Sequence, residues 1–372
     1  MKKLRLSPRP VMPAALGINR VQQLAVTSPK ILSFMSELAV PSIDVVVPVY
    51  NAAILTRRCI DSVVASLGQS IRYIYVQDDA SGDETREMLD RLPYKGVHVY
   101  HAPQNQGFGR SVNAAVGRSD ATYVLILNSD TLASEDFLPY LCGALAADPQ
   151  LAAIIPGGNH YAEFDLNQYP REPGGYILTH RLGGYAFLIR REVFQQMGGF
   201  DEIFGRGYYE DVDLGRRLNQ SGWRIGMHPD THICHEGGGS FGRDRAYKAL
   251  KRRSRTIYFS RYPSARRNIL LLSGNCPLTD FPLDLFNAVE NVFREGGSVH
   301  WFTPEPVPRL MCLHMTHNSG SLSVIARLLL RGWVREDKRI SEIWMLPNLP
   351  HPLRTLIVLL GYMRRLKVQL WE

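Results

Sequence analysis

Hydrophobic residues between positions 43 and 130 come in short blocks, and stretches of helical spacing lie between the blocks. Residues 43–49 read Ile-Asp-Val-Val-Val-Pro-Val, a β-branched run that predicts a strand buried on both faces. Similar runs predict further strands at 73–76, 97–101 and 123–127. The stretches between them predict helices at 55–67, 84–92 and 110–116. Strands that alternate with helices predict an open α/β sheet with right-handed crossovers.

Polar residues follow the predicted strands. Tyr50-Asn51 comes after the first, Asp78-Asp79 after the second, and Asn128-Ser129-Asp130 after the fourth. In open α/β sheets, ligands bind outside the carboxyl ends of the strands. Because these polar ends converge on one edge of the sheet, we expect a ligand site there.

Two common phosphate-binding loops are absent from the sequence. No G-x-x-x-x-G-K-[ST] pattern occurs, so a P-loop is excluded. Gly107 and Gly109 begin a dinucleotide fingerprint, but Val112 occupies the position of its third glycine. Phosphate binding must therefore come from a metal ion together with scattered donors.

A second group of candidate residues lies between positions 198 and 242. Glu210, Asp211 and Asp213 open a helical pattern, and the positive end of a helix dipole favours the ionised form of carboxylates there. An ionised carboxylate in a cleft is what a general base requires. His235 precedes three glycines, which allow close approach to its ring. We interpret Asp211 as the base and His235 as closing the same site; the alternative is a surface helix with a satisfied histidine nearby.

The remaining sequence predicts three regions. Residues 1–41 are basic and proline-punctuated, with one short helix expected at 31–38. Residues 42–263 hold the predicted sheet and end in a strongly basic helical stretch at 243–262. Residues 264–372 contain apolar runs at 268–273, 298–302 and 342–346, which predict a small second α/β module whose role the sequence does not give.

The composition and charge of the chain indicate its ligand class and its cellular compartment. The net charge of +8 suits a phosphate-bearing ligand, nucleic acid or an anionic membrane face, although no nucleic-acid recognition motif accompanies it. Five scattered cysteines without a CxxC pair indicate a reducing cytoplasm. Prolines interrupt the N-terminal stretch, so we expect no signal peptide, and no apolar run is long enough to span a bilayer. The basic helices at 243–255 and the segment 353–367 are candidates for peripheral contact with the inner membrane face; a core helix is the alternative for the latter.

Several motifs, taken in order, resemble family 2 glycosyltransferases. The resemblance covers about residues 42–242 and is closest to bacterial rhamnosyl- and galactofuranosyltransferases. The motifs are Val47-Pro48-Val49-Tyr50-Asn51, Asp78-Asp79-Ala80-Ser81-Gly82-Asp83, Asn105-Gln106-Gly107-Phe108, Leu127-Asn128-Ser129-Asp130-Thr131, Gly199-Phe200-Asp201-Glu202 and Glu210-Asp211-Val212-Asp213-Leu214. The resemblance implies a GT-A fold, which is a Rossmann-like open mixed sheet with flanking helices.

The resemblance also implies roles for individual residues. Asp211 would be the catalytic base, with Glu210 orienting it or touching the acceptor. Asp130 would hold Mg²⁺ or Mn²⁺, and His235 would help, because Asn128 replaces the family's first aspartate. The donor nucleotide would lie against Pro48, Tyr50, Asn51, Asp78 (reading the pyrimidine), Asn105, Arg110, Asn113, Asn128 and Ser129.

The expected function is therefore inverting, metal-dependent transfer of a sugar from a UDP- or dTDP-sugar. The acceptor would be a glycan or a lipid-linked molecule in bacterial cell-surface polysaccharide synthesis. A non-catalytic nucleotide-sugar-binding scaffold is one alternative, which Asp130, Asp211 and His235 disfavour. A nucleotidyltransferase is another, but it would need a glycine-rich loop with a basic residue, and none follows Tyr50.

Overall fold

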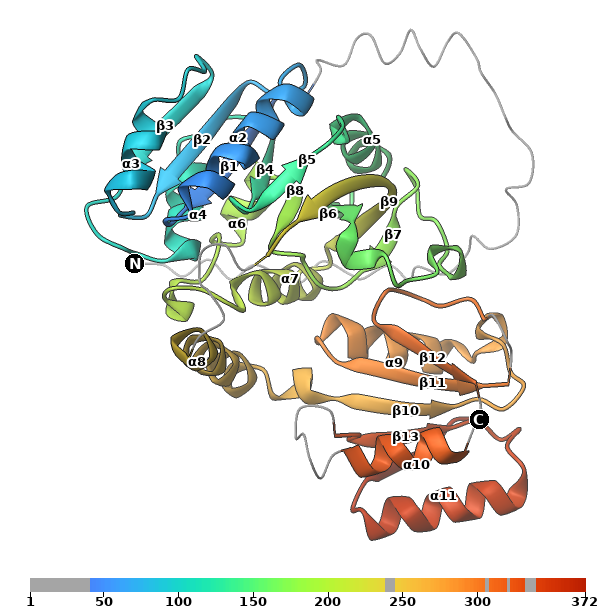
Figure 1. Ribbon diagram of the computed structural model, residues 1–372. Coiled ribbons are helices and arrows are strands. Elements are labelled where there is room, and N and C mark those ends of the chain that lie inside the picture. Colours follow the sequence, from blue (N-terminus) through green and yellow to red (C-terminus); the bar gives the residue numbers. More distant parts are fainter. Residues whose placement is uncertain (1–40, 238–244, 305–307, 320–321, 332–338) are drawn as a thin grey trace, which may run out of the picture. The chain divides into compact units, whose positions relative to one another are not determined.

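The computed structural model describes residues 41–237, 245–304, 308–319, 322–331 and 339–372. These residues form two β-sheets with flanking helices (Figure 1). The helix expected at 31–38 and the beginning of the basic stretch at 243–244 lie outside the described residues.

Four parallel strands form one half of the first sheet, and they are the four that the sequence predicts. Their order is β3-β2-β1-β4, with β1 paired to both β2 and β4. All seven residues of β1 are buried, which explains why its sequence is apolar on both faces. The bounds are β1 (Ile43–Val49), β2 (Tyr73–Asp78), β3 (Val97–His101) and β4 (Tyr123–Leu127).

Five more strands extend this sheet beyond β4 and make it mixed. They are β5 (Thr131–Ala133), β6 (Leu151–Gly158), β7 (Ile177–Thr179), β8 (Ala186–Arg190) and β9 (Arg224–His235). β8 runs antiparallel to β4 and β6, and β9 pairs in parallel with β6 and antiparallel with β5 and β7. In the β5–β9 pair, Thr131 lies opposite His235. This register brings two predicted site residues, Asp130 and His235, together although 105 positions separate them.

Helices flank the first sheet. They are α2 (Ala53–Leu67), α3 (Asp83–Asp90), α4 (Phe108–Val116), α5 (Leu138–Ala147), α6 (Arg191–Gln196) and α7 (Glu210–Gln220). The inward face of α2 carries Cys59, Ile60, Val63 and Leu67, at the three- and four-residue spacing of a helix that packs on a sheet. α4 packs against β1 and β2. α7 buries Leu214 and Leu218, one turn apart, and this fixes the orientation of the acidic residues at its start.

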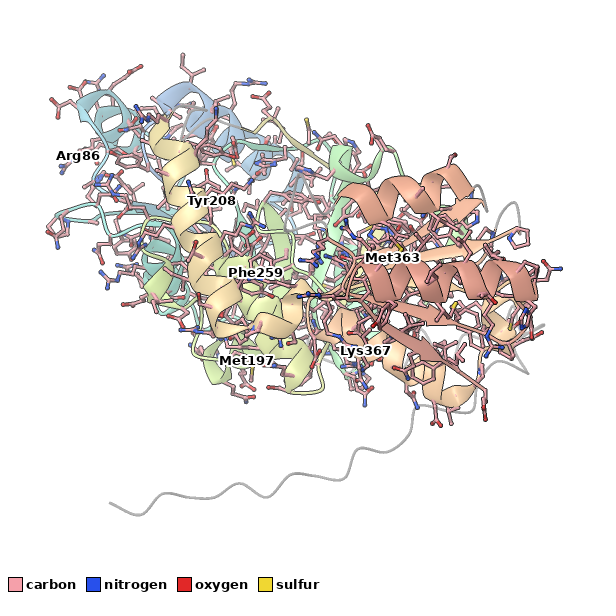
Figure 2. All side chains as sticks on the ribbon, turned by 90° about the horizontal axis from the view of Figure 1, so that it is seen from below. Arg86, Met197, Tyr208, Phe259, Met363 and Lys367 are labelled. Carbon is pink, nitrogen blue, oxygen red and sulfur yellow. The ribbon has the colours of Figure 1, made fainter. Side chains whose placement is uncertain are left out.

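The basic stretch forms one helix, α8 (Arg245–Arg261), and this helix is packed against the first sheet's loops (Figure 2). Ser254 and Tyr258 are buried on its inner face. The Ser254 hydroxyl donates to the carbonyl oxygen of Gly207 at 2.8 Å, and Tyr258 packs with Phe204. α8 therefore covers the segment that leads into α7.

The second sheet, in residues 268–370, is wholly parallel and has the order β12-β11-β10-β13-β14. Its strands are β10 (Asn268–Leu272), β11 (Ser298–Thr303), β12 (Met315–Ser319), β13 (Glu342–Met345) and β14 (Lys367–Leu370). The helices are α9 (Leu283–Arg294), α10 (Leu322–Arg331) and α11 (His351–Met363). The sequence predicted β10, β11 and β13 but not β12 or β14. These two are the edge strands, and their residues, Met-Thr-His-Asn-Ser and Lys-Val-Gln-Leu, lack a continuous apolar run.

The first sheet's region and the second module contact one another through helices α7 and α9. The Arg216 guanidinium of α7 donates to the Glu295 carbonyl oxygen and to the Ser264 hydroxyl. The His180 ring stacks on Phe293 with 5.8 Å between ring centroids. One hydrophobic cluster includes residues of both sheets. The α/β class, the open mixed sheet and the smaller C-terminal α/β module are confirmed; the domain boundaries at 41 and 263 stay a prediction.

Candidate functional site

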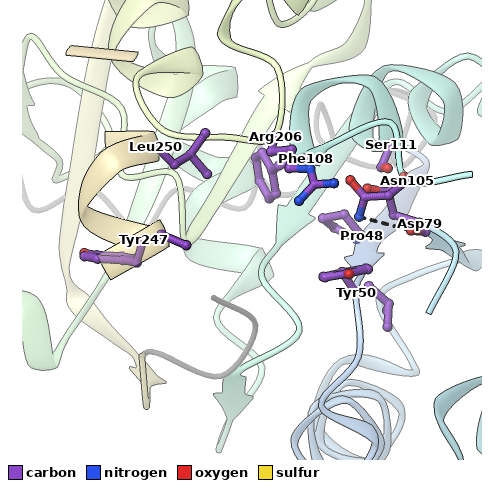
Figure 3. Close-up of a pocket in the computed structure, with 11 residues that line it drawn as sticks. Pro48, Tyr50, Asp79, Asn105, Phe108, Ser111, Arg206, Tyr247 and Leu250 are labelled. Atoms are coloured by element: carbon purple, nitrogen blue, oxygen red, sulfur yellow. Dashed lines mark hydrogen bonds between the residues drawn. The ribbon is translucent and has the colours of Figure 1, made fainter. Parts of the chain in front are cut away.

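A cavity of about 380 Å³ lies at the carboxyl ends of β1 and β2 (Figure 3). Its lining consists of Pro48, Val49, Tyr50, Asp79, Asn105, Phe108, Ser111, Arg206, Ala246, Tyr247 and Leu250. The sequence predicted Pro48, Tyr50 and Asn105 for this site. It did not predict the wall formed by Tyr247 and Leu250 of α8, because nothing in that basic stretch indicates which surface it covers.

The structure places Asp79 at the cavity and Asp78 behind it. Asp78 has no solvent exposure. One of its carboxylate oxygens accepts from the Ser81 N–H at 3.0 Å, and the other lies 2.7 Å from His101 Nδ1. The expectation that Asp78 reads the pyrimidine is therefore corrected, because both of its oxygens are engaged inside the protein.

Asp79 shapes the cavity through its carboxylate. Its two oxygens accept from the backbone N–H groups of Gln106 and Gly107, at 2.6 and 2.8 Å. Asn105 donates from Nδ2 to the Asp79 carbonyl oxygen at 3.3 Å, and Figure 3 shows this bond beside Pro48 and Tyr50. A Cβ on Gly107 would meet the Gly205 carbonyl oxygen at 2.2 Å, and the φ of Gly107 is +93°, so this turn requires glycine.

Three residues that are predicted to contact the nucleotide form hydrogen bonds or an ion pair within the protein. Asn51 accepts from the Gly82 N–H at 2.9 Å and has a left-handed φ of 58°. Arg110 pairs with Glu202 at 2.9 Å. Asn113 uses both ends of its amide on the backbone of Phe200, at 2.8 and 2.9 Å. None of the three is among the residues that line the cavity, so the expected contacts of Asn51 with the base and of Arg110 and Asn113 with the ribose or diphosphate stay predictions.

Asn128, Ser129 and Asp130 follow β4 and are buried or half-buried. His235 Nε2 lies 3.1 Å from Asp130 Oδ1. His235 Nδ1 lies 2.8 Å from Nε2 of His160, and the His235 ring stacks on Tyr185 with 5.3 Å between centroids. Asp130 and His235, which the sequence predicts in one site, thus lie side by side. His160 contacts His235 as well, and no feature of the sequence predicted this contact.

The chemistry of these side chains fits a divalent cation. A carboxylate, an imidazole and an amide oxygen suit Mg²⁺ or Mn²⁺. The Asn128 side-chain oxygen is buried and has no hydrogen-bond partner, as expected of a group whose partner arrives with a ligand. Within the described ranges, no group of three or more His, Cys, Asp and Glu side chains is placed to hold a metal alone.

Glu210 and Asp211 begin α7, and the pKa of each carboxyl group is raised. Burial, and next the charge of Asp211, raise the pKa of Glu210 to about 8. Burial also raises the pKa of Asp211, while the N–H groups of Val212 and Gly184 and the charge of Lys251 act in the opposite direction. The expectation that the helix start keeps both carboxyls ionised is corrected for Glu210, because a dipole worth about 0.3–1 kcal/mol does not offset its burial.

Asp211 is held against the backbone of Gly184. Its Oδ2 accepts from the Gly184 N–H at 3.1 Å. A Cβ on Gly184 would lie 2.7 Å from the same oxygen, so only glycine allows this approach. The glycine pair at 183–184 was the feature of the sequence that could have identified this contact.

The segment before α7 is conformationally strained. Tyr208 and Tyr209 have φ values of 71° and 73°, which cost side-chain-bearing residues free energy, and such residues cluster at functional sites. Tyr208 packs edge-on against Tyr247, and Lys251 Nζ lies 6.0 Å from the Tyr208 ring centroid. Burial raises the pKa of Tyr208, and Tyr247, Glu210 and Asp130 add to this effect. The charges of Glu210 and Asp130 therefore affect the pKa of Tyr208, and the Tyr208 ring also contacts Tyr247 of α8.

Buried oxygens without hydrogen-bond partners concentrate at these positions. Among the described residues, seven buried side-chain nitrogen or oxygen atoms have no partner. Three of the seven are Asn105 Oδ1, Asn128 Oδ1 and Glu210 Oε2, all at predicted site residues. A buried polar atom without a partner costs about 1–3 kcal/mol, so a polar ligand that supplies partners to these atoms would be stabilised.

Known proteins share the sequence pattern of this region. Residues 44–202 match the model for Glycosyl transferase family 2. The N-acetylglucosaminyl-diphospho-decaprenol L-rhamnosyltransferase of Mycobacterium tuberculosis is 27% identical over 231 residues, which cover 50% of this chain and 73% of that protein. Succinoglycan biosynthesis protein ExoO of Rhizobium meliloti is 31% identical over 223 residues, covering 55% of this chain and 63% of that protein.

Two further known proteins are similar to this chain. The pre-mycofactocin glycosyltransferase of Mycobacterium tuberculosis is 27% identical over 212 residues, covering 52% of this chain and 42% of that protein. The solved structure of a mannosyltransferase from Pyrobaculum calidifontis, in complex with GDP-Man and Mn²⁺, has a TM-score of 0.47 at 19% identity and covers 60% of this chain and 64% of that one.

Proposed function

Because this chain is a family 2 glycosyltransferase, with the family match at residues 44–202, we propose that it transfers a sugar from a pyrimidine nucleoside diphosphate to a hydroxyl group of a glycan or lipid-linked acceptor. We assign it to bacterial cell-surface polysaccharide synthesis, with inversion at the sugar carbon. The names of two relatives, an N-acetylglucosaminyl-diphospho-decaprenol L-rhamnosyltransferase and a succinoglycan biosynthesis protein, support this assignment.

The cavity beside β1 and β2 is the proposed donor site. Tyr50 and Pro48 provide apolar surface for a pyrimidine, and Asn105 Oδ1 provides a buried acceptor that lacks a partner. Arg206 is exposed and lines the same cavity, where its charge suits a diphosphate. Asp79 holds the loop that carries Asn105, and we assign it the positioning role in place of Asp78.

Asp211 is the proposed general base. The acceptor oxygen bonds to the anomeric carbon as the bond between that carbon and the diphosphate oxygen breaks. The acceptor proton goes to Asp211, and the electron pair of the broken bond leaves with the nucleoside diphosphate. Hydrogen bonding and Lys251 favour the ionised form of Asp211, while burial and the charge of Asp211 favour the protonated form of the neighbouring Glu210. The raised pKa of Asp211 also makes it a stronger base than an exposed aspartate.

Asp130, His235 and Asn128 would hold the divalent cation together with the donor diphosphate. When bound, such an ion supplies positive charge that stabilises the leaving diphosphate. His160 fixes the orientation of the His235 ring through the 2.8 Å contact at Nδ1.

The observation that carries this proposal is the group of buried oxygens without partners at Asn105, Asn128 and Glu210. Titration calorimetry with UDP, dTDP and GDP, each in the presence of Mn²⁺, tests the donor class. We expect UDP or dTDP to bind more tightly than GDP, and Asn105→Ala to weaken that binding. Tighter binding of GDP would contradict a pyrimidine site. Release of nucleoside diphosphate from the matching nucleotide sugar then tests the transfer itself.

A further inference from the structure

Helix α11 exposes a large apolar surface. Five of the exposed large hydrophobic residues in the described part of the chain belong to this one helix: Leu356, Val358, Leu359, Tyr362 and Met363. Leu359 is 55% exposed, Met363 68% and Tyr362 82%. Contiguous apolar surface of this kind marks an interaction site in a folded protein.

The same helix also has an inner apolar side, so its exposure is not a sign of loose packing. Ile357 is buried, and a Cβ on Gly361 would meet Val368 at 2.5 Å, which shows close contact between α11 and β14. Leu356, Leu359 and Met363 follow at intervals of three and four residues, which places them along one outer side. Figure 2 shows α11 in the foreground, with Met363 near its end and Lys367 beyond it.

The charge around this surface is mainly positive, although the Lys367 ammonium lies 3.9 Å from a carboxylate oxygen of Glu342 on the neighbouring strand. No aspartate or glutamate occurs between Glu342 and Glu372, and this interval contains Arg354, Arg364, Arg365 and Lys367. Arg365 and Lys367 are exposed. An apolar strip flanked by arginine and lysine is the composition of helices that lie in the interface of a bilayer with anionic lipids.

α8, the other basic helix, lacks this combination. Its buried residues Ser254 and Tyr258 face the first sheet's loops, and Tyr247 and Leu250 line the donor cavity. The described residues contain no helix that is both long and apolar enough to cross a membrane, and α11 has only 13 residues. Of the two membrane candidates in the sequence, α11 alone turns a broad apolar face outward.

We propose that α11 docks this protein on the surface of an anionic lipid bilayer. The helix lies parallel to the surface, with Leu356, Leu359 and Met363 in the acyl boundary and Arg365 and Lys367 at the lipid phosphates. A second copy of this chain would bind the exposed face of α11 less favourably than a bilayer would. Self-association through this face would bring two sets of basic residues close together, and they would repel one another. This inference does not depend on the proposed catalytic chemistry.

Vesicle flotation of the full chain tests the proposal. We expect the protein to float with mixed phosphatidylcholine–phosphatidylglycerol vesicles and far less with phosphatidylcholine alone. The double substitution Leu359→Glu with Met363→Glu should lower the bound fraction about tenfold or more, because apolar burial is lost. Arg365→Gln should lower it about fivefold, and only on the anionic vesicles.

Leu283→Glu is the matched control, since Leu283 is 58% exposed at the start of α9 in the same module. It should float like the wild type, and all variants should keep the wild-type melting temperature. Unchanged flotation of the Leu359→Glu, Met363→Glu variant would overturn the proposal. Equal binding to both kinds of vesicle would overturn the electrostatic part. A wild type that fails to float and forms dimers broken by the double substitution would assign the face to a second copy instead.

Discussion

The two sheets of this protein begin with the same strand order, and among the described residues only the first sheet carries a candidate site. In the first, strands taken in chain order lie as third-second-first-fourth, β3-β2-β1-β4, and the second repeats this with β12-β11-β10-β13. Each sheet therefore has a crevice between its first and fourth parallel strands, where ligands bind in open α/β sheets. The arrangement of strands alone does not decide which crevice is used.

The residues that follow the strands make the difference. After β4 come Asn128, Ser129 and Asp130, whereas Leu346 follows β13 and is buried in the core. After β10, the Ser273 hydroxyl accepts from the Trp301 indole N–H at 2.8 Å and donates to the Cys276 carbonyl oxygen at 3.0 Å. In the first sheet, Asn128 Oδ1 is buried without a partner. Polar groups satisfied within the protein stabilise a fold, and those left without partners are available to a ligand.

Asp211→Asn should have the largest effect on the first sheet's site. The substitution keeps the size of the side chain and removes the base, so turnover should fall at least about a hundredfold while nucleoside diphosphate binding persists. Initial rates and calorimetry on the same preparation measure both quantities. Asp230→Asn, on the exposed end of a surface ion pair, is the control and should leave both unchanged. Near-normal turnover of Asp211→Asn would move the base to another residue.

Gly184→Ala tests the position of Asp211 without changing its charge. The new methyl group would meet Asp211 Oδ2 at 2.7 Å, so the carboxylate must shift. A shift of about 1 Å near the reacting atoms can cost about a hundredfold in rate, and we expect at least a tenfold loss in kcat. Gly143→Ala, where a Cβ meets nothing within 4 Å, is the matched control. Equal rates for the two variants would show that the Gly184 contact does not position the base.

Metal removal should affect only the first sheet's site. We expect EDTA to abolish transfer and Mn²⁺ or Mg²⁺ to restore it. Asp130→Asn or His235→Ala should raise the metal concentration needed for half-maximal donor binding, and His160→Ala should raise it by about ten- to a hundredfold through the loss of His235 orientation. Full turnover in EDTA would instead assign Asp130 to sugar binding.

Glu210 predicts a dependence of stability on pH. Its pKa is raised to about 8 in the folded protein from an ordinary value near 4.5, so the folded state binds the proton more tightly than the unfolded chain. The stabilisation is present below the ordinary pKa and is lost as the pH rises through about 8. Glu210→Gln stays neutral, so its melting temperature should gain on that of the wild type between pH 5 and pH 9. Parallel melting curves for the two proteins would contradict the raised pKa.

The smallest effect on catalysis should come from the second sheet's crevice. Ser273→Ala removes the acceptor of the buried Trp301 N–H, which should cost about 1–3 kcal/mol of stability. Turnover at a temperature well below melting should stay within about twofold, because none of the residues that line the donor cavity belongs to the second sheet. Thermal unfolding and initial rates measure the two effects. A loss of turnover as large as that of Gly184→Ala would make the second crevice part of the catalytic site.

The sequence alone determined the strands β1 to β4, the polar edge they share and the carboxylates at the start of α7. These features rest on local patterns, since apolar runs and helical spacing need no distant partner. Pro48, Tyr50 and Asn105, which the sequence predicts for the nucleotide site, line the cavity, and their contact with a nucleotide stays a prediction. The edge strands β12 and β14 were missed because short polar strands form only when a neighbouring strand pairs with them.

Tertiary structure decided which side chains face the site. Asp78 and Asp79 are adjacent, and successive side chains of a strand point to opposite faces, so a run buried on both faces does not show which carboxylate reaches the cavity. The strand pairing between β5 and β9 brought His235 to Asp130, and the packing of α8 brought Tyr247 to the cavity. Burial then raised the pKa of Glu210 against the preference of its helix start. Each of these outcomes depends on contacts between chain segments that are far apart in the sequence, and a local sequence pattern does not predict which segments will be in contact.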